Sequence, residues 1–181
     1  MINTMKRKSI SLISAMLVFA FVGQTLADDE KAELTTEVND AKATLVKTDE
    51  GLKDIMEKAK GYVIFPSVAK GGLGIGAAAD TGQLLEKGQA VGEAKLRQVS
   101  VGFQAGGQSY IELICFEDQT SLDNFKKGNF EFSAQVSAVA VTAGVSKNAK
   151  YENGIMVLTL AKGGLMYEAS VGGQKFKYQA Y

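Results

Sequence analysis

The chain has 181 residues, of which 20 are basic and 20 acidic, and 46% of its side chains are hydrophobic, a composition typical of one folded domain. It contains no histidine, no tryptophan and one cysteine, which excludes histidine-dependent catalysis, thiolate zinc sites and intramolecular disulfides. We therefore expect a protein that is not an enzyme and that uses no metal and no cofactor.

The first 27 residues have the features of a secretory signal peptide. A basic stretch at 6–8 precedes a 13-residue apolar run, 10–22, that contains two serines, and the small residue Ala27 ends the segment. A membrane-spanning helix needs about 18 or more apolar residues. We therefore expect cleavage after Ala27 and a periplasmic mature protein, residues 28–181, that forms a single domain.

The expected mature chain is slightly acidic. Cleavage removes three basic and no acidic side chains, which leaves 17 basic and 20 acidic residues and a formal charge of −3. Nucleic-acid binding is disfavoured because it depends on an excess of basic charge. Arg97 is the one arginine in residues 28–181, so an anion site has to be local and made mainly of lysines.

Two helices are expected at the start of the mature chain. Apolar residues recur at three- and four-residue steps between Asp28 and Lys60, which is typical of amphipathic helices. The pattern is interrupted at 48–51, where Asp49 is suited to cap the second helix. Because the polar face mixes acidic and basic side chains, we expect both helices to pack on the domain and not to lie in a membrane surface.

From Gly61 onward the chain is rich in glycine and in β-branched and aromatic residues, which predicts mainly strands. The expected elements are strands at 62–65 (ending at Pro66), 99–105 and 110–116 (a hairpin around Gly106 and Gly107), 130–140, 155–161, 165–171 and 176–178, and a short helix at 120–127. Glycine-rich strands are stable where another backbone packs closely. We therefore predict an α+β fold in which N-terminal helices pack on a strongly curved, mainly antiparallel, glycine-rich β-sheet or barrel-like sheet.

Few groups in the sequence suit catalysis. The glycine cluster 71–76 departs from both glycine-rich phosphate-binding motifs and favours close strand packing. Glu112 and Glu131 alternate with their neighbours, which indicates a solvated sheet face, although a hydrolase that uses carboxylates alone stays open as a weak alternative. Cys115 lies in an apolar run, so we expect a buried and unreactive thiol.

Three ordered stretches carry a specific pattern. Residues 59–76 read AKGYVIFPSVAKGGLGIG, residues 100–113 read SVGFQAGGQSYIEL, and residues 160–173 read LAKGGLMYEASVGG. These stretches resemble the SYLF domain family, and together they extend over nearly all of the expected mature chain.

The resemblance implies a non-enzymatic lipid-binding module, because eukaryotic relatives bind phosphoinositides and some bind actin, whereas bacterial relatives are exported. The expected partner is phospholipid or an anionic membrane surface of the bacterial cell envelope, not actin and not nucleic acid. A structural or protein-interaction module of the envelope is the alternative. Lys60, Lys70 and Lys162 fall in the matching motifs, and with Arg97 they form the expected lipid- or anion-binding site.

Overall fold

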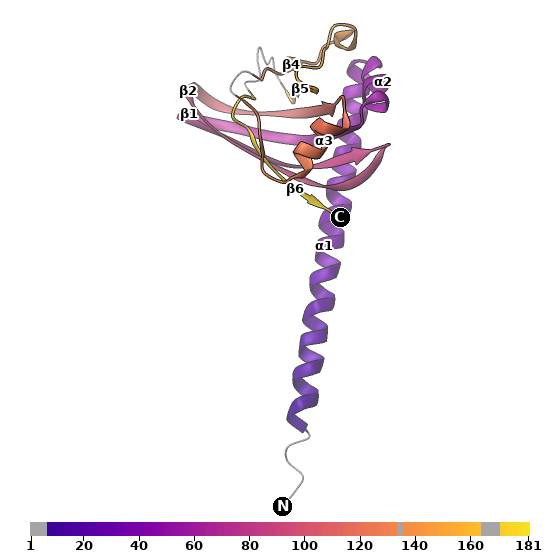
Figure 1. The fold of residues 1–181 in the computed structure, drawn as a ribbon. Coiled ribbons are helices and arrows are strands. Elements are labelled where there is room, and N and C mark those ends of the chain that lie inside the picture. The colour runs from indigo at the N-terminus through magenta and orange to yellow at the C-terminus, as the bar shows by residue number, and fades with distance from the viewer. Residues whose placement is uncertain (1–6, 134–135, 164–170) are drawn as a thin grey trace, which may run out of the picture. The chain divides into compact units, whose positions relative to one another are not determined.

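The computed structural model of the chain describes residues 7–133, 136–163 and 171–181, with side chains described from Asp28 onward apart from those at 72–75 and 100–106. It has the expected α+β architecture (Figure 1). The helices are α1 (Arg7–Thr48), α2 (Gly51–Lys58), α3 (Gln119–Lys126) and the 3-10 helix η1 (Val145–Lys147). The strands are β1 (Gly61–Glu86), β2 (Gln89–Phe116), β3 (Phe130–Glu131), β4 (Val139–Ala140), β5 (Ile155–Ala161) and β6 (Lys175–Ala180). Residues up to Thr35 and residues 36–181 form two compact units, and the second contains these strands.

β1 and β2 pair along their whole length as one antiparallel hairpin. Its turn residues, Lys87 and Gly88, have φ values of 51° and 80°, as a two-residue hairpin turn of this kind requires. The expected turn at Gly106 and Gly107 is wrong, because both glycines pair with glycines of β1 in the interior of the hairpin. The positive φ values, and not the density of glycine, decide where the chain reverses.

Pro66 does not end the first strand, so that expectation is also wrong. The ladder between β1 and β2 shifts register between Phe65 and Val68, and a β-bulge is one of the places where a strand tolerates proline. The N–H of Ser67 donates a hydrogen bond of 2.7 Å to the Asp80 carboxylate, farther along β1. β1 therefore continues through the proline and bends back toward its own second half.

This bend curls the sheet so that its two halves enclose a core, which confirms the strongly curved sheet expected from the sequence. β2 pairs with β6 along 92–97 and with β5 along 110–116. The rings of Phe65 and Phe176, from opposite halves, lie 5.8 Å apart. Gly82 packs directly on the backbone of the facing half. The large buried side chains of this core include Phe65, Tyr110, Phe116, Phe125, Phe132 and Phe176.

The other face of β1, β2 and β5 is covered by the helices. Buried side chains on the helices are Val38, Ala41 and Leu45 of α1 and Leu52 and Met56 of α2. Lys42 of α1 donates a hydrogen bond of 2.9 Å to the hydroxyl of Tyr62 in β1. Cys115, opposite Tyr62 in the ladder, is fully buried, and burial raises the pKa of its thiol to about 12. The expected buried cysteine is confirmed.

Asp49 joins the start of α2 to η1. Its carboxylate accepts a hydrogen bond of 3.0 Å from the N–H of Gly51, and it accepts two more, of 2.7 and 2.9 Å, from the N–H and hydroxyl of Ser146. These hydrogen bonds hold the pKa of Asp49 below its ordinary value, and the bond from the Ser146 N–H has the largest effect. Asp49 therefore satisfies a backbone donor at the helix start, as expected, although Glu50 occupies the cap position itself.

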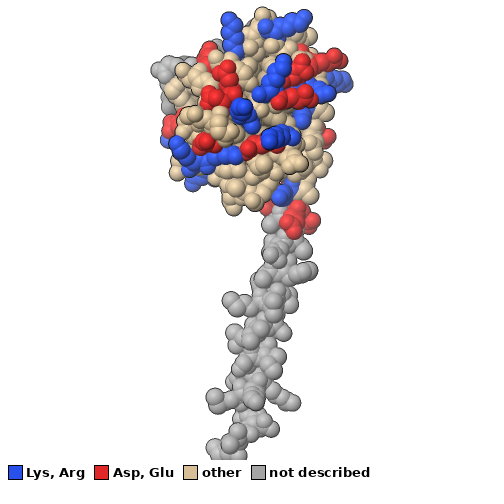
Figure 2. All heavy atoms as spheres, turned by 45° about the vertical axis from the view of Figure 1, so that its right-hand side comes forward, with Lys and Arg blue, Asp and Glu red and all other residues tan. Residues whose placement is uncertain are grey.

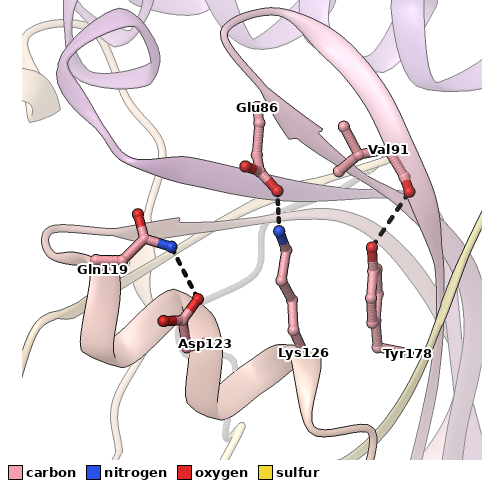
Figure 3. Close-up of polar contacts among 6 residues, drawn as sticks. All are labelled: Glu86, Val91, Gln119, Asp123, Lys126 and Tyr178. Carbon is pink, nitrogen blue, oxygen red and sulfur yellow. Dashed lines mark hydrogen bonds and ion pairs between the residues drawn. The ribbon is translucent and has the colours of Figure 1, made fainter.

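α3 lies at the turn end of the hairpin (Figure 3). Asp118 caps it by accepting a hydrogen bond of 2.8 Å from the N–H of Ser121. Lys126, in its last turn, forms an ion pair with Glu86 at the end of β1. The short helix expected in this region is confirmed.

The single strand expected at 130–140 is wrong. Its first residues form β3, which pairs with β6, and its last residues form β4, which runs parallel to β5. The segment crosses from one edge strand to another, so it cannot be one strand. β5 agrees with the strand expected at 155–161. The strand expected at 165–171 lies almost entirely outside the described residues.

The interior of the curled sheet contains a buried carboxyl group. Glu112 is fully buried, so the solvated position expected from the sequence is wrong. Its Oε2 accepts a hydrogen bond of 3.0 Å from the side-chain amide of Gln174, and among the described residues its Oε1 has no partner. Burial raises the pKa of Glu112 to about 8, Asp80 adds to the rise and Lys70 opposes it. The carboxyl group is therefore mainly protonated at neutral pH.

We predict that Gly82→Ala destabilises the protein far more than Gly107→Ala. A Cβ at position 82 would overlap the carbonyl oxygen of Ile64 in the facing half of the sheet, whereas a Cβ at position 107 meets nothing within 4 Å. Forced overlap of this kind costs about 1–3 kcal/mol. Chemical denaturation of both variants measures the difference, and equal midpoints would contradict the close approach of the two halves.

We predict that Glu112→Gln stabilises the protein increasingly as pH rises from 5 to 8. Over this range the unfolded chain, with a pKa near 4.5, is ionised while the folded carboxyl group, with a pKa of about 8, stays protonated. The wild type then loses up to about 1.4 kcal/mol of stability per pH unit through this group, and the amide removes that loss. Thermal unfolding at several pH values tests this, with the exposed Glu131→Gln as control. Parallel pH profiles for wild type and Glu112→Gln would disprove it.

Candidate functional site

The structure separates Lys60 and Lys162, two of the four residues expected to bind lipid. Both side chains are exposed. The N–H of Lys60 donates to the carbonyl of Phe116 and that of Lys162 to the carbonyl of Ser109. These carbonyls lie seven residues apart on β2, about 24 Å at roughly 3.4 Å per residue. The two lysines therefore do not share a site.

Lys70 is directed toward the core side of the sheet. It lies opposite Gln108 in the ladder, and alternate residues of a strand face opposite sides. It therefore shares the side of Tyr110 and Glu112, whereas the position of Lys162, opposite Ser109, belongs to the other side. Lys70 is half-buried, and this burial lowers its pKa while the nearby Glu112 opposes the shift. Its position fits a structural contact better than a lipid headgroup.

Arg97 is different, because it belongs to a cluster of exposed cations. It lies opposite Lys175 of β6, and two residues away Lys95 lies opposite Lys177. Alternation places all four side chains on the outer face of the two strands. The intervening residues Leu96 and Phe176, also opposite each other, are buried in the core. We call Lys95, Arg97, Lys175 and Lys177 the cationic sheet face.

Folding alone does not explain this cluster. Like charges directly opposite each other in an antiparallel ladder are destabilising, and the cationic sheet face contains two such pairs. Lys175 has an acidic neighbour, Glu131 of β3, at 3.5 Å, but the two side chains are 70% and 54% exposed. An exposed pair of this kind contributes about 0–1 kcal/mol. The repulsion persists in the free protein, and an external anion would relieve it.

The cationic sheet face adjoins a cavity and an exposed apolar residue. The cavity, of about 610 Å³, is lined by the four cations together with one carboxylate, that of Glu131, and with Asn129, Phe130 and Phe176. Val99 lies on the same face of β2, two residues beyond Arg97, and at 76% it is the most exposed of the described large apolar side chains. Cations, an aromatic ring and an exposed apolar residue are thus available to one bound molecule or surface.

The sequence signal for this cluster is a period of two that lies outside the three stretches resembling the family. Lys95-Leu96-Arg97 and Lys175-Phe176-Lys177 each place two cations around one apolar residue. In a strand whose other side is buried, that spacing puts both cations on the solvent side. The sequence shows this spacing in each of the two segments, but it does not show that β2 and β6 pair in the register that brings the four cations together.

Other site types find little support in the part of the chain that the structure describes. There, no group of three or more carboxylate or thiol side chains is placed to hold a metal ion. The helices there do not offer the length and hydropathy that a membrane span would need. Basic and acidic side chains are interspersed over the face shown in Figure 2. The cationic sheet face is therefore the candidate site.

Comparisons with known proteins support the family suggested by the sequence. Residues 97–180, which include most of the cationic sheet face, match the family model described as "Ysc84: Las17-binding protein actin regulator". Beta cell expansion factor A of Aeromonas veronii is 24% identical over 159 residues, which cover 83% of this chain and 58% of that protein. The chain thus spans little more than half the length of that relative. Both matches agree with the resemblance to the SYLF domain family seen in the sequence, and the family model matches the C-terminal part of the chain, residues 97–180.

Proposed function

We propose that this chain is a non-enzymatic protein of the bacterial cell envelope that binds anionic phospholipid surfaces through its cationic sheet face. The observation that carries the proposal is the pair of like-charged rows, Lys95 with Lys177 and Arg97 with Lys175. Both rows are exposed and weaken the free fold. A membrane phosphate layer supplies the missing negative charge.

The overall charge requires that this attraction be local. With a formal charge of −3 for residues 28–181, the whole protein is not drawn to an anionic bilayer. A cation close to an anionic membrane surface contributes about 1 kcal/mol. Four such cations on one face are enough for reversible association, which salt should weaken strongly because exposed charges are screened.

We predict that Lys95→Glu with Arg97→Glu reduces binding to phosphatidylglycerol-containing vesicles at least about tenfold, given about 1 kcal/mol per cation at the surface. The matched control is Lys60→Glu with Lys162→Glu, which changes the net charge equally at the two exposed lysines that the family motifs suggested. Vesicle co-flotation at low and moderate salt measures both. Loss of binding in the control pair alone would move the site to the motif lysines.

The same substitutions separate binding from folding. Each new carboxylate lies opposite Lys175 or Lys177, so two repulsive pairs become attractive ones. Opposite-charge pairs across strands contribute about 0.2–1 kcal/mol. We predict that the Lys95→Glu, Arg97→Glu variant unfolds at the same or higher denaturant concentration than the wild type. Weaker binding accompanied by a clear loss of stability would mean that the cations serve the fold.

Export is the second part of the proposal, and it rests on the basic and apolar pattern of residues 1–27. We predict that the protein recovered from the periplasmic fraction begins at Asp28, because the 13-residue apolar run is too short to span a membrane and is cut after Ala27. Intact mass spectrometry measures the first residue. Membrane-bound protein that retains residues 1–27 would refute this part.

A further inference from the structure

A second cavity, of about 590 Å³, lies between α1, α2 and the turn of the β1–β2 hairpin. Buried Met56 and Tyr62 contribute to its lining, together with Ala43 and Val46 of α1. We call this cavity the helix–hairpin groove. Its volume lies within the range of about 300–1,000 Å³ that small-molecule sites occupy.

The rest of the lining is mainly basic. Lys42, Lys53 and Lys87 contribute to it, and the one carboxylate in the lining, Glu57, lies 3.9 Å from Lys53. Among the described residues, no carboxylate lies within ion-pair distance of Lys42 or Lys87. The groove therefore combines an apolar lining with two cations that lack an acidic partner there.

Lys42 and Tyr62 form a polar corner in this groove. Lys42 is half-buried, and its ammonium group donates a hydrogen bond of 2.9 Å to the hydroxyl of Tyr62. That hydroxyl uses its oxygen to accept this bond, so its own hydrogen is available to a further acceptor. A cation of a half-buried residue whose hydrogen-bond partner carries no charge is stabilised by a bound anion. A compact carboxylate could accept from both groups at once.

We propose that the helix–hairpin groove binds a free fatty acid, with the carboxylate at Lys42 and Tyr62, within reach of Lys87, and the alkyl chain against Met56 and Val46. A concave cavity between three elements suits one acyl chain, whereas the outer face of β2 and β6 can meet an extended surface. The compact carboxylate suits the half-buried position of Lys42. This site is separate from the cationic sheet face and does not depend on the proposed membrane function.

Titration calorimetry of the full chain with dodecanoate, below its micelle concentration, tests the charge requirement. Lys42→Gln with Lys87→Asn should bind at least about tenfold more weakly, since a hydrogen bond to a charged group contributes about 1.5–3 kcal/mol. Glutamine retains a donor for Tyr62, and asparagine tolerates the positive φ of the turn. Lys47→Gln with Lys58→Gln, exposed and outside the groove, is the matched control and should bind like the wild type.

A second variant tests the apolar lining without changing charge. Ala43 is exposed on α1, so Ala43→Trp should leave the fold intact by circular dichroism while it fills the groove and abolishes dodecanoate binding. The cationic sheet face variant, Lys95→Glu with Arg97→Glu, should bind dodecanoate normally, so the two sites fail independently. Equal binding by the Lys42→Gln, Lys87→Asn variant, equal binding of dodecanol, or tighter binding of lysophosphatidylglycerol would each overturn the fatty-acid assignment.

Discussion

The rest of the structure depends on the face-to-face packing of the two halves of the β1–β2 hairpin. A flat hairpin of this length would separate Phe65, on one half, from Phe176, which lies beside the other half. The bend brings these rings to 5.8 Å, and Gly82 lets the two backbones approach where a side chain would not fit. The hairpin thereby encloses its own core, and the smaller strands and α3 complete it.

This curvature also separates the two outer faces of the sheet. The half that contains Tyr62 and Cys115 is covered by α1 and α2, and its outward side chains are apolar and buried. The half that pairs with β6 has two opposed pairs of cations at outward positions, Lys95 with Lys177 and Arg97 with Lys175. Each strand residue there faces one side of the sheet. Leu96 and Phe176 pack in the core, and the cations that flank them in the sequence face solvent. Substituting those cations therefore leaves the core unchanged.

The buried Glu112 contributes to the interior of the sheet and not to its outer face. It lies in the middle of the enclosed interior, with Gln174 as its hydrogen-bond partner. Gln174 directly precedes β6, so this buried hydrogen bond anchors the segment that leads into the strand with Lys175 and Lys177. The same short segment therefore contributes Gln174 to the interior of the sheet and Lys175 and Lys177 to its outer face.

The sequence by itself determined the element types, because helix and strand periodicities and glycine content are local properties. It predicted the N-terminal helices, α3, β5, the buried Cys115 and a strongly curved sheet. It misplaced the hairpin turn and the effect of Pro66, which depend on backbone conformation and on a bulge that the chain tolerates only in context. Of the four residues expected to bind lipid, Arg97 is the one that the structure places in the cationic sheet face. Lys175, the residue opposite Arg97 in the ladder, is 78 residues away in the chain. A short sequence motif cannot show that two such distant residues are neighbours. Only the strand register decided which lysines stand together, because pairing between distant segments is fixed by the packing of the whole core.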